Sequence, residues 1–214
     1  MIMTQILWFI TFFFVSTTMF CQHRFIENRG QWPEKVQFKT DIGGGSLYLE
    51  KRKLTFDRYD REIVSQVFAA HHGEKPLAPP EKLDCHAYQM SFLGANEVEP
   101  KGSRAFKTKY AFYLGNRSGK NASAYEEVIY EDLYTGIDLK VHSRKHLKYD
   151  FAIKPGADPK VIKIRYKGVK PLLRNESELL LNTSVGKVME SEPFAYQVID
   201  GKIKRIECAF KIDG

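Results

Sequence analysis

The clearest chemical pattern lies between residues 137 and 153, where charged and apolar side chains alternate. If residues 143–145 form the loop of a β-hairpin, one face of that hairpin brings like side chains into opposition. The opposed pairs are Asp138 with Asp150, Lys140 with Lys148, and His142 with His146. Two opposed carboxylates repel unless a metal ion, a shared proton or a functional role compensates, so Asp138 and Asp150 are candidate metal ligands. The alternative is an ordinary solvated face that diagonal aspartate–lysine pairs neutralise.

Two further places combine residue types that ligate metals or form catalytic dyads. His71 and His72 are adjacent imidazoles, but a proline-rich loop fixes neither, and a metal site needs more than two ligands. Cys85 precedes His86, and because neighbours in a strand point to opposite faces, packed strand residues are favoured over a cysteine–histidine dyad. The sequence has no GxSxG, HExxH, P-loop or Rossmann pattern. We therefore predict a non-enzyme without a cofactor.

A basic strand provides the candidate ligand-binding surface. In the run VIKIRYK, residues 161–167, apolar and basic side chains alternate with the period of a strand that has one face in water. The inward set is Ile162, Ile164 and Tyr166, and the outward set is Lys163, Arg165 and Lys167. The outward cations, with Tyr166 and neighbouring tyrosines, are expected to contact anionic carbohydrate or the cell envelope.

The elements that position these residues are predicted to be strands. Alternation indicates hairpins over 46–59, 137–153 and 193–212, the last with a tight Asp200-Gly201 turn. Isolated strands are predicted over 36–40, 86–93 and 109–114, and at most one helical turn over 125–133. The predicted fold class is all-β, an antiparallel, sandwich-like packing with little helix.

Two polar stretches are predicted to be loops, the proline-rich residues 69–82 and the small residues 115–123. The second divides the chain after its leader into two β subdomains of similar size, 22–118 and 119–214. With 43% apolar and 13% aromatic residues, the chain is far from the composition of disordered proteins.

The net charge of +7 permits anionic partners. The basic residues are spread along predicted strands, and no RNP sequence or zinc-finger pattern is present, which argues against nucleic acid. Acidic glycan or the anionic cell surface fits this distribution better.

Residues 1–21 have the pattern of a secretory signal peptide, with an apolar run from Ile6 to Val15 and small or hydroxylated residues before the end. The run is shorter than the ~20 apolar residues that span a bilayer, so no stable membrane span is expected after cleavage. The chain is therefore predicted to be exported to the periplasm, the cell surface or the medium. Cys85 and Cys208 remain after cleavage, and they either form a disulfide or pack as buried thiols. In the second case, Cys208 is expected to lie with Ile206, Phe210 and Ile212 on the inward face of a strand.

Seven segments carry a family resemblance. They are FIENRGQWP (25–33), DIGGGSLYLEK (41–51), HAYQMSFLGAN (86–96), YAFYLGN (110–116), LYTGIDLKV (133–141), LKYDFAIKPGADP (147–159) and EPFAYQ (192–197). In this order they resemble the N-terminal domain of large secreted Bacteroidota proteins that carry SBBP β-propeller repeats and end in a gliding-motility or type IX secretion sorting domain. The resemblance implies a domain of unknown function at the cell surface or outside the cell, whose partners are the other domains of a longer parent protein.

Because relatives of this kind continue into further strands and repeats, the chain ending at Gly214 is expected to be a truncated gene or a fragment. The favoured function is a non-catalytic structural or interaction module. The alternative is carbohydrate or cell-envelope binding, and a third hypothesis is a metal-dependent enzyme that uses Asp138 and Asp150.

Overall fold

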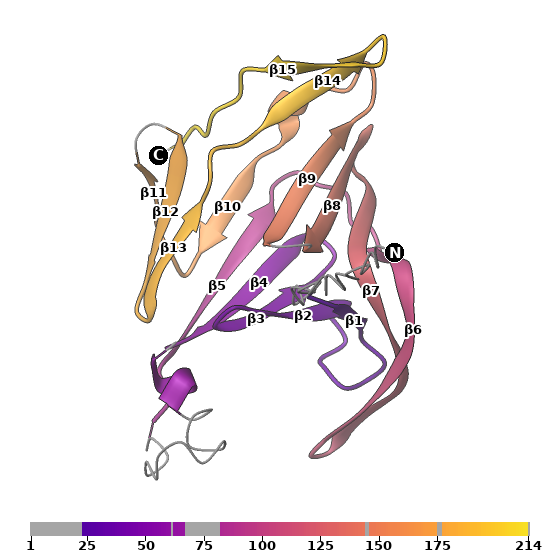
Figure 1. Ribbon diagram of the computed structural model, residues 1–214, viewed down its shortest axis with the longest axis vertical. Coiled ribbons are helices and arrows are strands. Elements are labelled where there is room, and N and C mark those ends of the chain that lie inside the picture. The colour runs from indigo at the N-terminus through magenta and orange to yellow at the C-terminus, as the bar shows by residue number, and fades with distance from the viewer. Residues whose placement is uncertain (1–22, 61, 67–81, 144–145, 175–176, 214) are drawn as a thin grey trace, which may run out of the picture.

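A computed structural model describes residues 23–60, 62–66, 82–143, 146–174 and 177–213, and Figure 1 draws them in colour. Within these ranges the regular structure is antiparallel β-sheet, apart from a helical turn over 62–66 and a 3-10 turn at Pro159–Val161. The all-β prediction with little helix is therefore confirmed. Residues 1–21 and the histidines at 71 and 72 lie outside the described residues, so the structure does not bear on those predictions.

Ten strands form one large sheet. They are β1 (Phe25–Glu27), β2 (Phe38–Ile42), β3 (Gly45–Leu49), β4 (Lys53–Tyr59), β5 (Cys85–Phe92), β6 (Lys101–Leu114), β7 (Arg117–Tyr134), β8 (Ile137–Ser143), β9 (Leu147–Ile153) and β10 (Ile164–Lys167). Their order is β10-β5-β4-β3-β2-β1-β7-β8-β9, and β6 pairs with β7 off this path.

Two smaller sheets follow along the chain. The first contains β11 (Pro171–Arg174), β12 (Glu178–Thr183) and β13 (Gly186–Glu190), and the second contains β14 (Ala195–Ile199) and β15 (Lys202–Ile206). Asp200 and Gly201 both have positive φ, 50° and 72°, at the turn between β14 and β15. This is the backbone that a two-residue hairpin of Asp-Gly type requires, so the predicted turn is confirmed.

The large sheet curls until its two ends approach each other, as the positions of β9 and β10 in Figure 1 show. Phe92 of β5 and Phe151 of β9 lie near opposite ends of the strand order, yet their ring centroids are 6.1 Å apart. Alternate residues of the strands fill the inside of the curl with apolar side chains, and burying one such side chain contributes roughly 1.5–3 kcal/mol. The fully buried members include Phe25, Leu47, Leu49, Leu54, Met90, Val128, Tyr130, Ile137 and Leu139.

Glu190 of β13 connects the two ends of the curl. Its carboxylate accepts hydrogen bonds from the hydroxyl of Tyr149 on β9 at 2.6 Å and from that of Tyr166 on β10 at 2.7 Å. Burial, followed by the charge of Glu190, raises the pKa of Tyr149, and burial together with neighbouring Tyr149 and Glu190 raises that of Tyr166. Both tyrosines therefore stay neutral donors, and the β11–β13 sheet packs on the large sheet through them and through Leu181.

The predicted pairing within the 137–153 hairpin is wrong by two residues. Ser143 is a buried strand residue opposite Leu147 rather than the first residue of the loop, so Lys140 faces Asp150 and Asp138 faces Ala152. This register places opposite charges across the strands, where the predicted register would have opposed like charges. The apolar face survives the shift, since Ile137, Leu139 and Val141 are buried as expected.

The stretch predicted to be a loop at 115–123 is mostly strand. Leu114 pairs with Arg117 across a tight turn, and β7 continues through Tyr134 while pairing with β6, β1 and β8. The large sheet therefore runs across the boundary predicted between residues 118 and 119, with strands from both sides of it. Among the described residues, no helix is long and apolar enough to cross a membrane.

Candidate ligand-binding surface

The basic strand lies at an edge of the large sheet, and its alternation is as predicted. Ile162, Ile164 and Tyr166 pack against the core, while Lys163, Arg165 and Lys167 are exposed on the outer face. Within the described part of the chain, none of these three cations has an ion-pair partner. Their charges are therefore not neutralised by neighbouring carboxylates, unlike that of Lys154, which contacts both Asp132 and Asp138.

Uncharged hydrogen-bonding side chains adjoin these cations on the same face. Arg165 pairs with Ser91 of β5 and Lys167 pairs with Gln89, which itself pairs with Thr55 of β4. The Gln89 side-chain amide donates to the Thr55 hydroxyl at 3.4 Å. We call the set Lys163, Arg165, Lys167, Gln89, Ser91 and Thr55 the β10 face. It combines positive charge with amide and hydroxyl groups that both donate and accept hydrogen bonds.

Tyr166 does not belong to the β10 face. Strand alternation turns its ring inward, and its hydroxyl donates to Glu190. Tyr48 of β3 is an aromatic residue on the outer side, where it pairs with Thr55, and Lys39 Nζ lies 5.8 Å from the centre of its ring. The sequence pattern of a single strand could not indicate Tyr48, because its position next to Thr55 depends on the pairing of β3 with β4.

Asp138 and Asp150 are engaged separately. Asp138 accepts a hydrogen bond from the backbone N–H of Asp132 at 2.7 Å and lies 3.3 Å from Lys154, whereas Asp150 lies 2.7 Å from His142. The two carboxylates are not opposite each other, which removes the repulsion that made them a candidate metal site. In the ranges that the structure describes, no three histidine, cysteine or acidic residues are grouped so as to hold a metal ion.

Cys85 and Cys208 are both exposed free thiols in the structure. The expectation of an inward face with Ile206 and Cys208 is wrong, because β15 ends at Ile206 and both residues are exposed. His86 has a packing role: its Nε2 lies 2.8 Å from the carbonyl oxygen of Gly168, and its Nδ1 lies 3.1 Å from the backbone nitrogen of Ser184. These contacts join β5 to the turn after β10 and to the turn before β13 and leave no dyad with Cys85.

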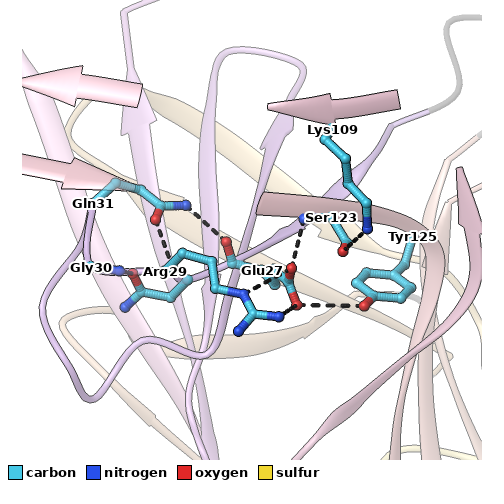
Figure 2. Close-up of polar contacts among 8 residues, drawn as sticks. Glu27, Arg29, Gly30, Gln31, Lys109, Ser123 and Tyr125 are labelled. Carbon is cyan, nitrogen blue, oxygen red and sulfur yellow. Dashed lines mark hydrogen bonds and ion pairs between the residues drawn. The ribbon is translucent and has the colours of Figure 1, made fainter. Parts of the chain in front are cut away.

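Glu27 of β1 is the centre of a polar network that sequence patterns did not indicate, and Figure 2 shows its partners. The backbone N–H of Ser123 donates to one carboxylate oxygen at 2.7 Å, and Arg29 Nε lies 3.0 Å from the same oxygen. Lys109 donates to the Ser123 hydroxyl at 2.6 Å, but this serine is only 4% exposed, so a substrate has no access to it. The network therefore joins β1, β6 and β7.

Burial alone would raise the pKa of Glu27, but the hydrogen bonds from Ser123 and the charge of Arg29 outweigh it, and the pKa is lowered. A lowered pKa stabilises the fold above the unfolded-state pKa of glutamate, and the contribution is lost as the pH falls through the folded-state value. We therefore expect Glu27→Gln to destabilise the protein at neutral pH and the difference from wild type to shrink below about pH 4.5. Urea unfolding between neutral and acidic pH measures this, and a difference that stays constant or grows on acidification contradicts it.

The N-terminal loop, residues 28–37, follows β1 and is held by Asn28. The Asn28 side-chain amide donates to the carbonyl oxygens of Trp32 and Val36 at 3.1 and 2.7 Å, and its Oδ1 accepts from the N–H of Gly30 at 3.0 Å. The loop packs on the β6–β7 hairpin, where the Trp32 and Phe112 ring centroids are 5.6 Å apart. The segment FIENRGQWP is therefore a structural unit of the fold.

Fold and surface together define an all-β domain built around one curled antiparallel sheet, with a basic edge face on β10. The chain belongs to the family described as domain of unknown function DUF7948, whose model matches residues 25–214, from the start of β1 to beyond β15. The resemblance noted in the sequence is confirmed to that extent. No curated protein and no solved structure matches the chain.

Proposed function

We propose that this domain is a non-catalytic interaction module of an exported protein and that it binds an acidic glycan chain through the β10 face. The observation that carries the proposal is the row of three exposed cations, Lys163, Arg165 and Lys167, without ion-pair partners among the described residues. Since no carboxylate among the described residues neutralises these charges, a partner of opposite charge is the natural complement.

The geometry of the β10 face suits an extended polyanion. Arg165 and Lys167 are alternate residues of β10, which lie roughly 6.6 Å apart, and Lys163 directly precedes the strand, so the three cations can contact successive acidic groups along one chain. Gln89 and Ser91 lie beside them in the neighbouring strand and offer hydrogen bonds to sugar hydroxyl groups, while the Thr55 hydroxyl already donates to Glu50 at 2.9 Å. Tyr48 adds an aromatic ring on the same outer side of the sheet.

Two features of the sequence support a location outside the cytoplasm. The apolar run within residues 1–21 has the length and order of a secretory signal, and seven segments resemble the N-terminal domain of secreted Bacteroidota proteins with SBBP repeats and a C-terminal sorting domain. We therefore propose that the module works in the periplasm, at the cell surface or in the medium. There it would be one domain of a longer parent protein and would cooperate with the other domains of that protein.

We expect the protein to bind polygalacturonate and chondroitin sulfate but not neutral dextran, and binding to weaken between about 0.05 and about 0.5 M sodium chloride because salt screens exposed charges. The triple variant Lys163→Glu, Arg165→Glu, Lys167→Glu should lose at least about tenfold in affinity, since each reversed charge repels the polyanion. Biolayer interferometry with immobilised glycan measures both effects.

A matched control separates the β10 face from the overall charge of the protein. Lys187, Lys202 and Lys204 are exposed on β13 and β15, and reversing all three changes the net charge by the same amount. This control variant should keep most of the wild-type affinity. Absence of binding to both acidic glycans, or equal losses in the two triple variants, would overturn the proposal.

A further inference from the structure

The hairpin of β14 and β15 is a two-stranded sheet with both of its faces exposed to water. Within the described ranges these two strands pair only with each other. Apart from Ala195, which is half-buried, every residue of β14 and β15 is exposed. A two-stranded hairpin is at best marginally stable in water, and a third strand or a packed face normally stabilises it. The hairpin is therefore an incomplete sheet that a further strand would complete.

One face of this hairpin is apolar. Val198 and Ile203 lie opposite each other on it, and they are 63% and 72% exposed. Phe194 and Tyr196 extend the same face, with their ring centroids 5.7 Å apart, and both are also exposed. A continuous row of large, exposed apolar side chains is typical of a surface that a partner covers.

The opposite face of the hairpin is basic. Lys202 and Lys204 face uncharged residues of β14, and within the described part of the chain neither lysine has an ion-pair partner. Three acidic residues nearby lie outside the two strands. They are Glu192, which is 3.2 Å from Arg205, Asp200 in the turn, and Glu207 beyond the end of β15. The two lysines therefore complement a partner that carries carboxylates.

The free edge of β15 offers backbone hydrogen bonds to such a partner. Figure 1 draws β15 at the margin of the molecule, with β14 between it and the other sheets. In a two-residue hairpin the residues that flank the turn form a hydrogen-bonded pair, and such pairs alternate with pairs that are not hydrogen-bonded. Lys202 flanks the turn opposite Ile199, so the N–H and C=O groups of Ile203 and Arg205 point away from β14. These are the groups that an added strand would use.

We propose that β15 binds an extended segment of a partner protein in which apolar and acidic residues alternate. Beside β15, such a strand would place its apolar residues next to Ile203 and its carboxylates next to Lys202 and Lys204. A second copy of this chain fits less well, because antiparallel pairing of β15 with itself about any of residues 202–205 opposes like charges. The surface does not include the β10 face, so this inference is independent of the glycan-binding proposal.

NMR titration of the ¹⁵N-labelled protein with two short, end-capped peptides tests the proposal, one alternating valine with glutamate and the other valine with lysine. The glutamate peptide should bind saturably and at least about tenfold more tightly, because like charges directly opposite each other repel. It should shift the amide resonances of β15 and slow hydrogen exchange of the Ile203 and Arg205 N–H groups, which would form the new bonds. The protein alone should sediment as a monomer.

Reversing the charges on β15 provides the decisive variant. Lys202→Glu combined with Lys204→Glu should lose the glutamate peptide and gain the lysine peptide, an exchange that unfolding of the hairpin could not produce. Lys120→Glu combined with Lys187→Glu, at exposed positions of β7 and β13, changes the net charge equally and should keep the wild-type preference. The proposal would be overturned by no saturable binding of the glutamate peptide, by equal affinities for the two peptides, by shifts confined to other surfaces, or by self-association through β15 without peptide.

Discussion

Replacing Gly45 with alanine is expected to destabilise the protein by about 3 kcal/mol. Gly45 is the first residue of β3, has φ of 157°, and pairs with Ile42 of β2 and Arg58 of β4. An added Cβ would lie 1.8 Å from the carbonyl oxygen of Asp57 and 2.9 Å from its carbonyl carbon. These are backbone atoms within the paired strand, so no side chain can rotate away and the β3–β4 pairing itself must shift.

Gly186 provides the matched control. It also has a positive φ, 124°, but an added Cβ would meet no atom within 4 Å. Gly186→Ala should therefore cost only about 1 kcal/mol, the usual penalty for an L-residue in this region. Urea denaturation followed by circular dichroism gives both free energies of unfolding. Equal losses in the two variants would show that the close approach of β3 to β4 is wrong.

Asn28→Ala should have an effect of similar size, about 3 kcal/mol, because several hydrogen bonds are lost together. The Asn28 amide donates to the carbonyl oxygens of Trp32, Pro33 and Val36, and Oδ1 accepts from the N–H groups of Gly30 and Trp32. Without these bonds the N-terminal loop loses the contacts that fold it onto the β6–β7 hairpin. The thermal unfolding midpoint and the urea midpoint should both fall.

Asn28→Asp separates the two halves of this interaction. Aspartate keeps the oxygen that accepts from Gly30 and Trp32 but cannot donate to the three carbonyl groups. At low pH the protonated carboxyl restores one donor, so the loss of stability should lie between zero and that of Asn28→Ala. When the carboxylate ionises near three carbonyl oxygens at higher pH, the loss of stability should increase. A fully tolerated alanine variant would contradict the structural role assigned to the motif.

Local patterns in the sequence predicted the strands well where one face is wet and one is dry. The VIKIRYK alternation placed Lys163, Arg165 and Lys167 outside, and the Asp200-Gly201 pair located a hairpin turn, because each property depends on a few neighbouring residues. The β10 face could be predicted as far as its own strand extends. Its members Gln89 and Thr55 depend on pairing between distant segments and could not be predicted from the sequence.

The small residues at 115–123 led to the wrong prediction of a loop. Gly119 lies in β7 and is small because Gln31 of the N-terminal loop packs on it, with an added Cβ only 2.0 Å from Gln31 Oε1. Ala122 and Ala124 are likewise fully buried. A run of small residues is typical of a flexible loop, but it also permits close packing of another segment against a strand, and the sequence of the run does not distinguish these cases.

The pairing register between strands was the second property that the sequence did not predict correctly. In the 137–153 hairpin the side-chain alternation is the same for both pairings, so the apolar face was predicted while the charge partners were not. Charge complementarity across the strands favours the observed pairing of Lys140 with Asp150. The contacts of this hairpin with β6 and β7 depend on pairing between segments distant in the sequence, so the positions of Arg104 and Glu127 beside Lys140 could not be predicted.

The most direct test of the central claim is to map the residues that an acidic glycan contacts by NMR spectroscopy. We expect titration of the ¹⁵N-labelled protein with a polygalacturonate oligosaccharide to shift the amide resonances of β10 and of Gln89 and Ser91 in β5, while those of β14 and β15 stay in place. Shifts confined to other surfaces, or no saturable shifts at low salt, would contradict the assignment of the β10 face as the glycan-binding surface.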